Sequence, residues 1–260
     1  MRCSEIIQKL EELSPSSFAE SWDNVGLLAG RRDREVTKVY LALDATDEVI
    51  AEAVRIGAQM LLTHHPLIFT AMKRVTAEDF IGRRVAKLLR HDISYYAMHT
   101  NFDLMGMADA AADEMGLRNR QVLAITYEDE IAKEGIGRFG TLPSIMSLLE
   151  CAEYVKKVFH VENVRVFGDP EAEMEYAAVS PGSAKSVIKS AIALGADVLI
   201  SGDVDHHEGI DCVAQGMNVI DAGHYGMEKI FMPYMEEFFH RELPQIETVT
   251  APEKNPFWTI

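Results

Sequence analysis

The stretch V-Y-L-A-L-D-A-T-D-E-V-I-A-E-A-V-R-I-G-A-Q-M-L-L-T-H-H-P, residues 39–66, decides the fold. It opens on an apolar run typical of a buried strand and passes into a helical pattern that Thr46 and Asp47 can cap and that ends near Gly57. A second apolar run follows over residues 59–63. Strand, helix and strand in this order predict a parallel βαβ unit. We therefore expect an α/β fold with mostly parallel sheets.

Strand and helix patterns alternate along the rest of the chain, apart from a loop-like segment over residues 15–30. Pro233 is expected to kink the last helix or to mark its first turn. We expect helices over residues 3–13, 47–58, 78–92, 109–117, 144–159, 183–196, 208–216 and 226–243, and strands over residues 38–45, 59–63, 93–98, 120–126, 137–143, 164–169, 175–181, 198–203, 218–223 and 245–250.

The pattern restarts after about residue 126, which suggests two related halves. When residues 39–65 are set beside 176–203, Gly57 aligns with Gly195, and Gly202 stands where the first half has His64. The alternative is that any two βαβ units look alike. Duplication predicts two related α/β domains whose strand ends face one cleft. We place the first at 1–126, joined by the segment from about 225 to 260, and the second at 127–224.

Composition narrows the classes of function. The 260 residues are 48% hydrophobic and carry a formal net charge of −16, so the chain can fold and its acidic surface disfavours general binding to nucleic acid or anionic membranes. A local basic pocket stays possible. Cys3, Cys151 and Cys212 form no paired motif and are expected to be small apolar residues in a reducing compartment. No secretion signal or membrane-length apolar run is present, so we expect a cytoplasmic location and no membrane contact.

Histidines cluster after the predicted strands. His64, His65, His99, His206, His207 and His224 all follow a strand, at the edge of a parallel sheet where ligands bind. In T-H-H-P, residues 63–66, adjacent imidazoles in extended chain point to opposite sides, so two metal ions could take one each. The alternative is a pair of turn histidines that bond to the backbone.

Two further motifs pair an imidazole with a carboxylate four residues later. These are H-T-N-F-D, with His99 and Asp103, and H-Y-G-M-E, with His224 and Glu228. If a helix begins at the histidine, both side chains lie on one face and supply the nitrogen and oxygen ligands that divalent cations accept. The alternative is that the acidic residue only favours a helix N-terminus.

Two polar segments are harder to interpret. In S-G-D-V-D-H-H, residues 201–207, Asp203 and His207 could support the site or contact substrate, or they could be polar residues at a helix start. In S-W-D-N-V-G-L, residues 21–27, we expect Trp22 to be a core or lid anchor. Asp23 and Asn24 are expected to be turn residues.

Together these motifs resemble the Nif-three-like family of dinuclear metal proteins, whose bacterial members are called GTP cyclohydrolase type 2 homologues. The resemblance covers essentially the whole chain. It implies two α/β domains, a pair of divalent metals in the cleft and a ring-shaped homohexamer. The ligands it implies are His64, His65, Asp103, His224 and Glu228.

The resemblance and the residues suggest a dinuclear metal-dependent hydrolase. A metal-bridged hydroxide would attack a nucleotide or another small anionic phosphorylated substrate, and His99, Asp203 and His207 would move protons. The metals could be zinc, iron, manganese or cobalt. The alternative is a non-enzymatic metal-binding scaffold or regulator that binds a protein partner. Phosphate-loop, dinucleotide-binding and serine-elbow motifs are absent, which disfavours those classes.

Overall fold

The computed structural model describes residues 1–128 and 132–260, which form two compact units. The first unit contains Met1–Phe102 and Phe231–Glu253, and the second contains Asp103–Ile230 and Lys254–Ile260. The chain therefore divides at Phe102, whereas the sequence pattern placed the boundary near residue 126. The reason is that the helix after Phe102 packs against strands of the second sheet.

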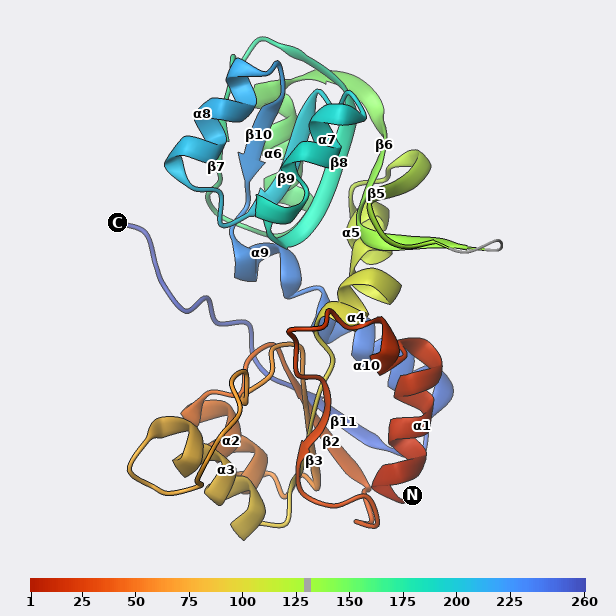
Figure 1. The fold of residues 1–260 in the computed structure, drawn as a ribbon, viewed down its shortest axis with the longest axis vertical. Helices are drawn as coiled ribbons and strands as arrows, with labels where there is room; N and C mark the ends of the chain where they lie inside the picture. The colour runs from red at the N-terminus through yellow and green to blue at the C-terminus, as the bar shows by residue number, and fades with distance from the viewer. Residues whose placement is uncertain (129–131) are drawn as a thin grey trace. The chain divides into compact units, whose positions relative to one another are not determined.

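The first unit is an α/β sandwich around a sheet with the strand order β1-β4-β3-β2-β11, which within the described residues has five strands. Strands β4, β3, β2 and β11 are parallel, and β1 pairs antiparallel with β4. Helices α2 and α3 cover one face and α1 and α10 the other (Figure 1). The strands are β1 (Gly26–Ala29), β2 (Lys38–Ala42), β3 (Met60–Thr63), β4 (Ser94–Ala97) and β11 (Glu247–Thr250), and the helices are α1 (Cys3–Leu13), α2 (Asp47–Arg55), α3 (Phe80–Arg90), α4 (Thr100–Phe102) and α10 (Phe231–Glu242), with a 3₁₀ turn at Ser16–Phe18.

The second unit has a sheet with the order β5-β6-β8-β9-β10-β7, six strands within the described residues. Strands β8, β9 and β10 are parallel, and β6 and β7 run against their neighbours. The strands are β5 (Arg118–Glu128), β6 (Lys133–Ser147), β7 (Arg165–Phe167), β8 (Glu173–Ser183), β9 (Val198–Gly202) and β10 (Asn218–Asp221), and the helices are α5 (Ala108–Glu114), α6 (Leu148–Val158), α7 (Ile188–Ala193), α8 (His206–Ala214) and α9 (His224–Glu228), with a π-helical turn at Asp103–Met107 and a 3₁₀ turn at Ala184–Ser186.

Alternate residues of the central strands face two apolar layers in this second unit. Val198 and Ile200 of β9 pack with α5 and α6, whereas Leu199 between them packs with α7 and α8. Helices on both faces explain why β9 is apolar throughout and not alternating. The α/β class with mostly parallel strands is therefore confirmed. The described residues contain no helix that is both long and apolar enough to span a membrane.

Most predicted elements are present, and four predictions need correction. Residues 26–29 lie in the segment predicted to be a loop but form β1, because their backbone pairs with the edge of β4. Residues 144–147 extend β6, and Ser147 then caps α6 with a hydrogen bond from the Glu150 amide. The helix predicted over 183–196 is shorter and follows a 3₁₀ turn. The last helix is broken into α9 and α10, with Pro233 in the first turn of α10, where its missing N–H costs nothing.

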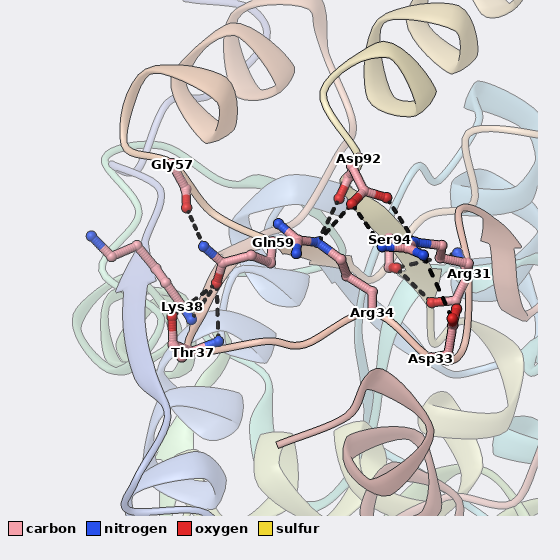
Figure 2. Close-up of polar contacts among 9 residues, drawn as sticks. All are labelled: Arg31, Asp33, Arg34, Thr37, Lys38, Gly57, Gln59, Asp92 and Ser94. Atoms are coloured by element: carbon pink, nitrogen blue, oxygen red, sulfur yellow. Dashed lines mark hydrogen bonds and ion pairs between the residues drawn. The ribbon is translucent and has the colours of Figure 1, made fainter.

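A polar cluster joins the starts of β2 and β3, at the edge opposite the strand ends (Figure 2). The Gln59 Oε1 atom accepts hydrogen bonds from the backbone amides of Thr37 and Lys38, both 2.9 Å long, and from the Thr37 hydroxyl at 3.1 Å. Its Nε2 donates to the Gly57 carbonyl at 2.7 Å. Both ends of this one amide are therefore used within the fold.

An ionic group beside it fastens the start of β4 (Figure 2). Arg31 donates to both carboxylate oxygens of Asp92, at 3.0 and 3.2 Å, and Arg34 Nε lies 3.0 Å from the same carboxylate. Ser94 Oγ donates to the Arg31 carbonyl at 3.0 Å. Asp92 has a positive φ of 53°, a conformation that Asp tolerates better than most residues. We call the side of the sheet where β2, β3 and β4 begin the start edge; Gln59, Asp92 and their partners in Figure 2 lie there. The opposite side, where these strands finish, is the end edge.

Candidate metal centre

Three histidines of the first unit meet at the ends of two neighbouring strands. His64 and His65 directly follow β3, and His99 follows β4 after one residue. Because β3 and β4 are parallel, with Thr63 opposite Ala97, their carboxyl ends reach the same edge. The ring centroids of His64 lie 4.9 Å from His65 and 5.2 Å from His99. One ligand atom from each of the three lies within 4.8 Å of the others, so this group could hold a metal ion.

The Nδ1 atoms of His64 and His65 are each bound to an oxygen acceptor. His64 Nδ1 is 2.8 Å from the Met98 carbonyl, and His65 Nδ1 is 2.8 Å from Asp44 Oδ1. A carbonyl or carboxylate oxygen only accepts, so in both rings Nδ1 carries the proton. This assigns the lone pair to Nε2, the arrangement of histidines that ligate a metal while an outer group fixes the ring.

His99 is held in the same way by Asp23. Its Nδ1 lies 2.9 Å from Asp23 Oδ1, and the Asp23 side chain is fully buried. The other carboxylate oxygen accepts from the Thr100 amide at 3.0 Å and the Thr100 hydroxyl at 2.6 Å. Burial alone would raise the pKa of Asp23, but the hydrogen bonds from His99 and Thr100 outweigh it and lower the pKa to about 2. Asp23 is therefore an ionised acceptor at neutral pH.

In the second unit, His224 and Glu228 lie at the two ends of the single helical turn α9. His224 Nε2 is 2.9 Å from Glu228 Oε2, as expected for side chains four residues apart on one helix face. His224 Nδ1 is 2.8 Å from Asp203 Oδ2, so this imidazole also has an outer carboxylate. The Glu228 residue is only 2% exposed. A buried carboxylate facing an imidazole nitrogen suits a cation held by both.

Two glycines make room for this arrangement. A Cβ atom on Gly182 would lie 2.5 Å from Glu228 Oε1, and one on Gly202 would lie 2.5 Å from the His224 amide nitrogen. Any larger residue would displace the helix turn or the carboxylate. A side chain at position 202 would therefore clash with the α9 backbone, which packs directly on Gly202.

Asp103 belongs to the same unit and begins the π-helical turn. One of its carboxylate oxygens lies within 4.8 Å of one from Glu228. Two ionised carboxylates at this separation repel each other, and a divalent cation removes the repulsion. The donor set of the second unit, one imidazole nitrogen and two carboxylates, is therefore suited to a divalent metal.

A family model described as Duf34/NIF3 (NGG1p interacting factor 3) matches residues 1–256. The chain belongs to the DUF34/NIF3 family. The Clostridium perfringens protein named GTP cyclohydrolase 1 type 2 homolog is 34% identical over 261 residues, which cover 99% of each chain. The crystal structure of a Bacillus cereus protein related to NIF3 superposes with a TM-score of 0.90 at 24% identity, covering 100% of this chain and 99% of that one. That of a Staphylococcus aureus hypothetical protein superposes with a TM-score of 0.89 at 30% identity and the same coverage.

In this NIF3 family chain the residues predicted to move protons lie in different settings. His99 adjoins His64 and His65, and Asp203 contacts His224. His207 is exposed at the start of α8, where its ring lies 5.2 Å from that of His206. Among the described residues, His207 is in none of the groups whose ligand atoms gather within 4.8 Å.

Sequence reasoning missed two residues that orient histidines, Asp23 and Asp44. Asp23 was expected to be a turn residue, and its partner His99 lies 76 positions further along the chain. The Asp44 contact with His65 spans 21 positions. Asp44 lies at the end of a strand predicted over residues 38–45, which was a local signal, whereas Asp23 lies in the segment expected to be a loop and had none.

Proposed function

We propose that this NIF3 family protein is a hydrolase that depends on two divalent metal ions. His64 and His65 from the first unit, with Asp103, His224 and Glu228 from the second, are the proposed ligands. The observation that carries the proposal is the orientation of the imidazoles. His64 and His65 each place Nδ1 against an oxygen acceptor, which makes Nε2 the atom that would bind a metal ion.

The mixed nitrogen and oxygen donors suit zinc, iron, manganese or cobalt. When bound, such ions act as Lewis acids that polarise a phosphoryl or carbonyl oxygen and activate water. The ligands come from separate parts of the chain, which passes from one unit to the other at Phe102–Asp103, at Ile230–Phe231 and at Glu253–Lys254. Asp103 is the first residue of the second unit after Phe102, and Glu228 lies two residues before the boundary at Ile230.

A small anionic substrate is supported by local positive charge in an otherwise acidic protein. The loop between β3 and α3 contains a cavity of about 420 Å³ lined by Met72, Lys73, Arg74, Asp79 and Ile81. Two cationic side chains there offer a place for phosphate. The name of the C. perfringens relative refers to a nucleotide, and we propose that the substrate is a nucleotide or another phosphorylated small molecule.

The remaining polar residues receive roles in this proposal. His99, held by Asp23, contacts the substrate and transfers a proton at Nε2. Asp203 fixes the ring of His224, and His207 contacts a substrate group on the side of the second unit. From the family resemblance we also propose that the protein is a homohexamer and is cytoplasmic. Light scattering of the purified protein tests the hexamer.

Turnover tests the hydrolase. Protein loaded with zinc, manganese, iron or cobalt is assayed on a panel of nucleotides and sugar phosphates, beside the variants Asp103→Ala and Glu228→Ala. We expect about two metal equivalents per chain in the wild type, as in other two-metal hydrolases, and activity that both variants abolish. Full metal content without activity above the variants would instead favour the scaffold that binds a protein partner.

A further inference from the structure

Two large aromatic side chains of the first unit are exposed side by side. Trp22 is 56% exposed and Phe69 is 51% exposed, although both residues are large and apolar. Their ring centroids are 5.7 Å apart and their planes are inclined by 42°. Two such rings in water lack the stabilising free energy that burial would give. Their exposure therefore indicates a function at the surface.

The pair adjoins the histidines at the strand ends. The Trp22 centroid is 6.0 Å from that of His99, and the Phe69 centroid is 6.2 Å from it, both in edge-on geometry. His99 in turn lies 5.5 Å from His65. A ligand resting on the two aromatic rings would therefore have its substituents within reach of these imidazoles.

Hydrogen bonds hold the two aromatic residues in place. Asn24, two residues after Trp22, donates from Nδ2 to the carbonyl of Ile68, the residue before Phe69, at 2.5 Å. Asp23 lies between Trp22 and Asn24 in the sequence, and its buried side chain binds His99. The loop that carries Trp22 is thus hydrogen-bonded to the loop that carries Phe69 and to His99. The surface that the two rings present is therefore formed before any ligand binds.

The surroundings favour a small ligand over a protein partner. Ser21 precedes Trp22 and Thr70 follows Phe69, and both are exposed polar residues. Polar residues thus flank both rings in the sequence, whereas a stable protein interface buries roughly 800 Å² on each partner. One planar ring of the size of a nucleobase matches the area of two aromatic side chains.

We propose that Trp22 and Phe69 form a stacking subsite for a planar heteroaromatic ring of the substrate. The proposal rests on the proposed function only in placing this ring beside a catalytic site, and the binding of the ring is measured separately from turnover. Stacking of this kind is sequence-tolerant, because every nucleobase has a π face, so purines and pyrimidines should both bind.

Fluorescence of Trp22 provides the test. Trp22 and Trp258 are the two tryptophans of the chain, so the variant Trp258→Phe leaves Trp22 as the single reporter. This protein is titrated with guanosine, adenosine and uridine 5′-monophosphates, and with ribose 5-phosphate, which has no ring system to stack. We expect saturable quenching by the nucleotides and none by ribose 5-phosphate.

Phe69→Ala in the same background should weaken nucleotide binding about ten- to hundredfold, the range for one aromatic–base contact. The matched control is Phe80→Ala, since Phe80 is also 54% exposed but lies on α3 against Arg84. Thermal melting verifies that both variants fold. Calorimetry with Trp22→Ala repeats the measurement without the reporter and should show the same loss.

The proposal is overturned if no nucleotide binds, if ribose 5-phosphate quenches equally, or if Phe69→Ala and Phe80→Ala have equal affinities. Nucleotide binding that depends on Phe69 but leads to no turnover supports the subsite and counts against the hydrolase. Turnover that is insensitive to Phe69→Ala and Trp22→Ala supports the hydrolase and counts against the subsite.

Discussion

The two edges of the first sheet use polar side chains in opposite ways. At the start edge, both ends of the Gln59 side-chain amide form hydrogen bonds with the backbone, and Arg31 and Arg34 both bind the Asp92 carboxylate. At the end edge, His64 and His65 each use Nδ1 for a hydrogen bond within the fold, and each has a possible ligand atom within 4.8 Å of those of the neighbouring histidines. The same strands connect the two edges, so the difference lies only in the residues that follow or precede them.

This contrast gives a physical criterion for separating structural from ligand-binding polar groups. A group whose donors and acceptors all serve the fold stabilises it, and its loss costs stability. A group that is fixed through one atom and offers a second atom to a cluster of similar groups is oriented for a ligand. Variants at the two edges should therefore affect different measurements.

The largest effect is expected for His65→Ala at the end edge. Loss of a proposed ligand should weaken metal binding by more than about a hundredfold, since removal of an outer partner alone costs about 10–100-fold. Elemental analysis and competition with a chelating dye measure it. The control His91→Ala removes an exposed histidine at the end of α3 and should bind metal as the wild type does. Equal affinities of the two variants would remove His65 from the ligand set.

A smaller loss is expected for Asp44→Asn. The amide can still accept from His65 Nδ1 but lacks the negative charge that strengthens this hydrogen bond, so metal affinity should fall about 10–100-fold. Asp33→Asn at the start edge is the matched control, because Asp33 is an exposed carboxylate beside Arg31. If both variants bind metal equally well, Asp44 does not orient a ligand.

At the start edge, Gln59→Ala should lower the free energy of unfolding by about 1–3 kcal/mol, because the amides of Thr37 and Lys38 lose their acceptor. Metal affinity should not change. Urea denaturation measures the stability, with Gln8→Ala on the exposed face of α1 as the control. A loss of metal binding equal to that of Asp44→Asn would show that the two edges are not independent.

The smallest effect is expected for Asp92→Asn, which keeps a residue that tolerates the positive φ but removes the charge. The hydrogen bond from Arg31 lowers the pKa of Asp92 below its ordinary value of 3.8. Its ion pairs therefore stabilise the fold fully above pH 3.8, and this contribution is lost as the pH falls further.

At neutral pH we expect Asp92→Asn to be less stable by under about 1 kcal/mol, as is usual for exposed ion pairs. The difference from the wild type should shrink in acid, and thermal melting at several pH values measures it. A difference that does not depend on pH would mean that the charge of Asp92 contributes nothing.

Some parts of the site could be predicted from sequence and others could not. T-H-H-P placed His64 and His65 correctly at a strand end, because an apolar run followed by polar residues is a local signal. Trp22 was expected to be a core or lid anchor, and the core interpretation is wrong, since the side chain is half exposed. Strand β1 was missed because its residues form a strand only through pairing with β4, which lies about 70 positions later.

The sequence by itself determined most of the order of strands and helices, and the edge of the sheet at which the histidines stand. Both follow from apolar periodicity and from the rule that parallel strands end together. Only the tertiary structure decided which oxygen faces each imidazole and that two aromatic rings lie open beside His99. These contacts join loops that are distant in sequence, and their hydrogen bonds leave no periodic pattern in the chain.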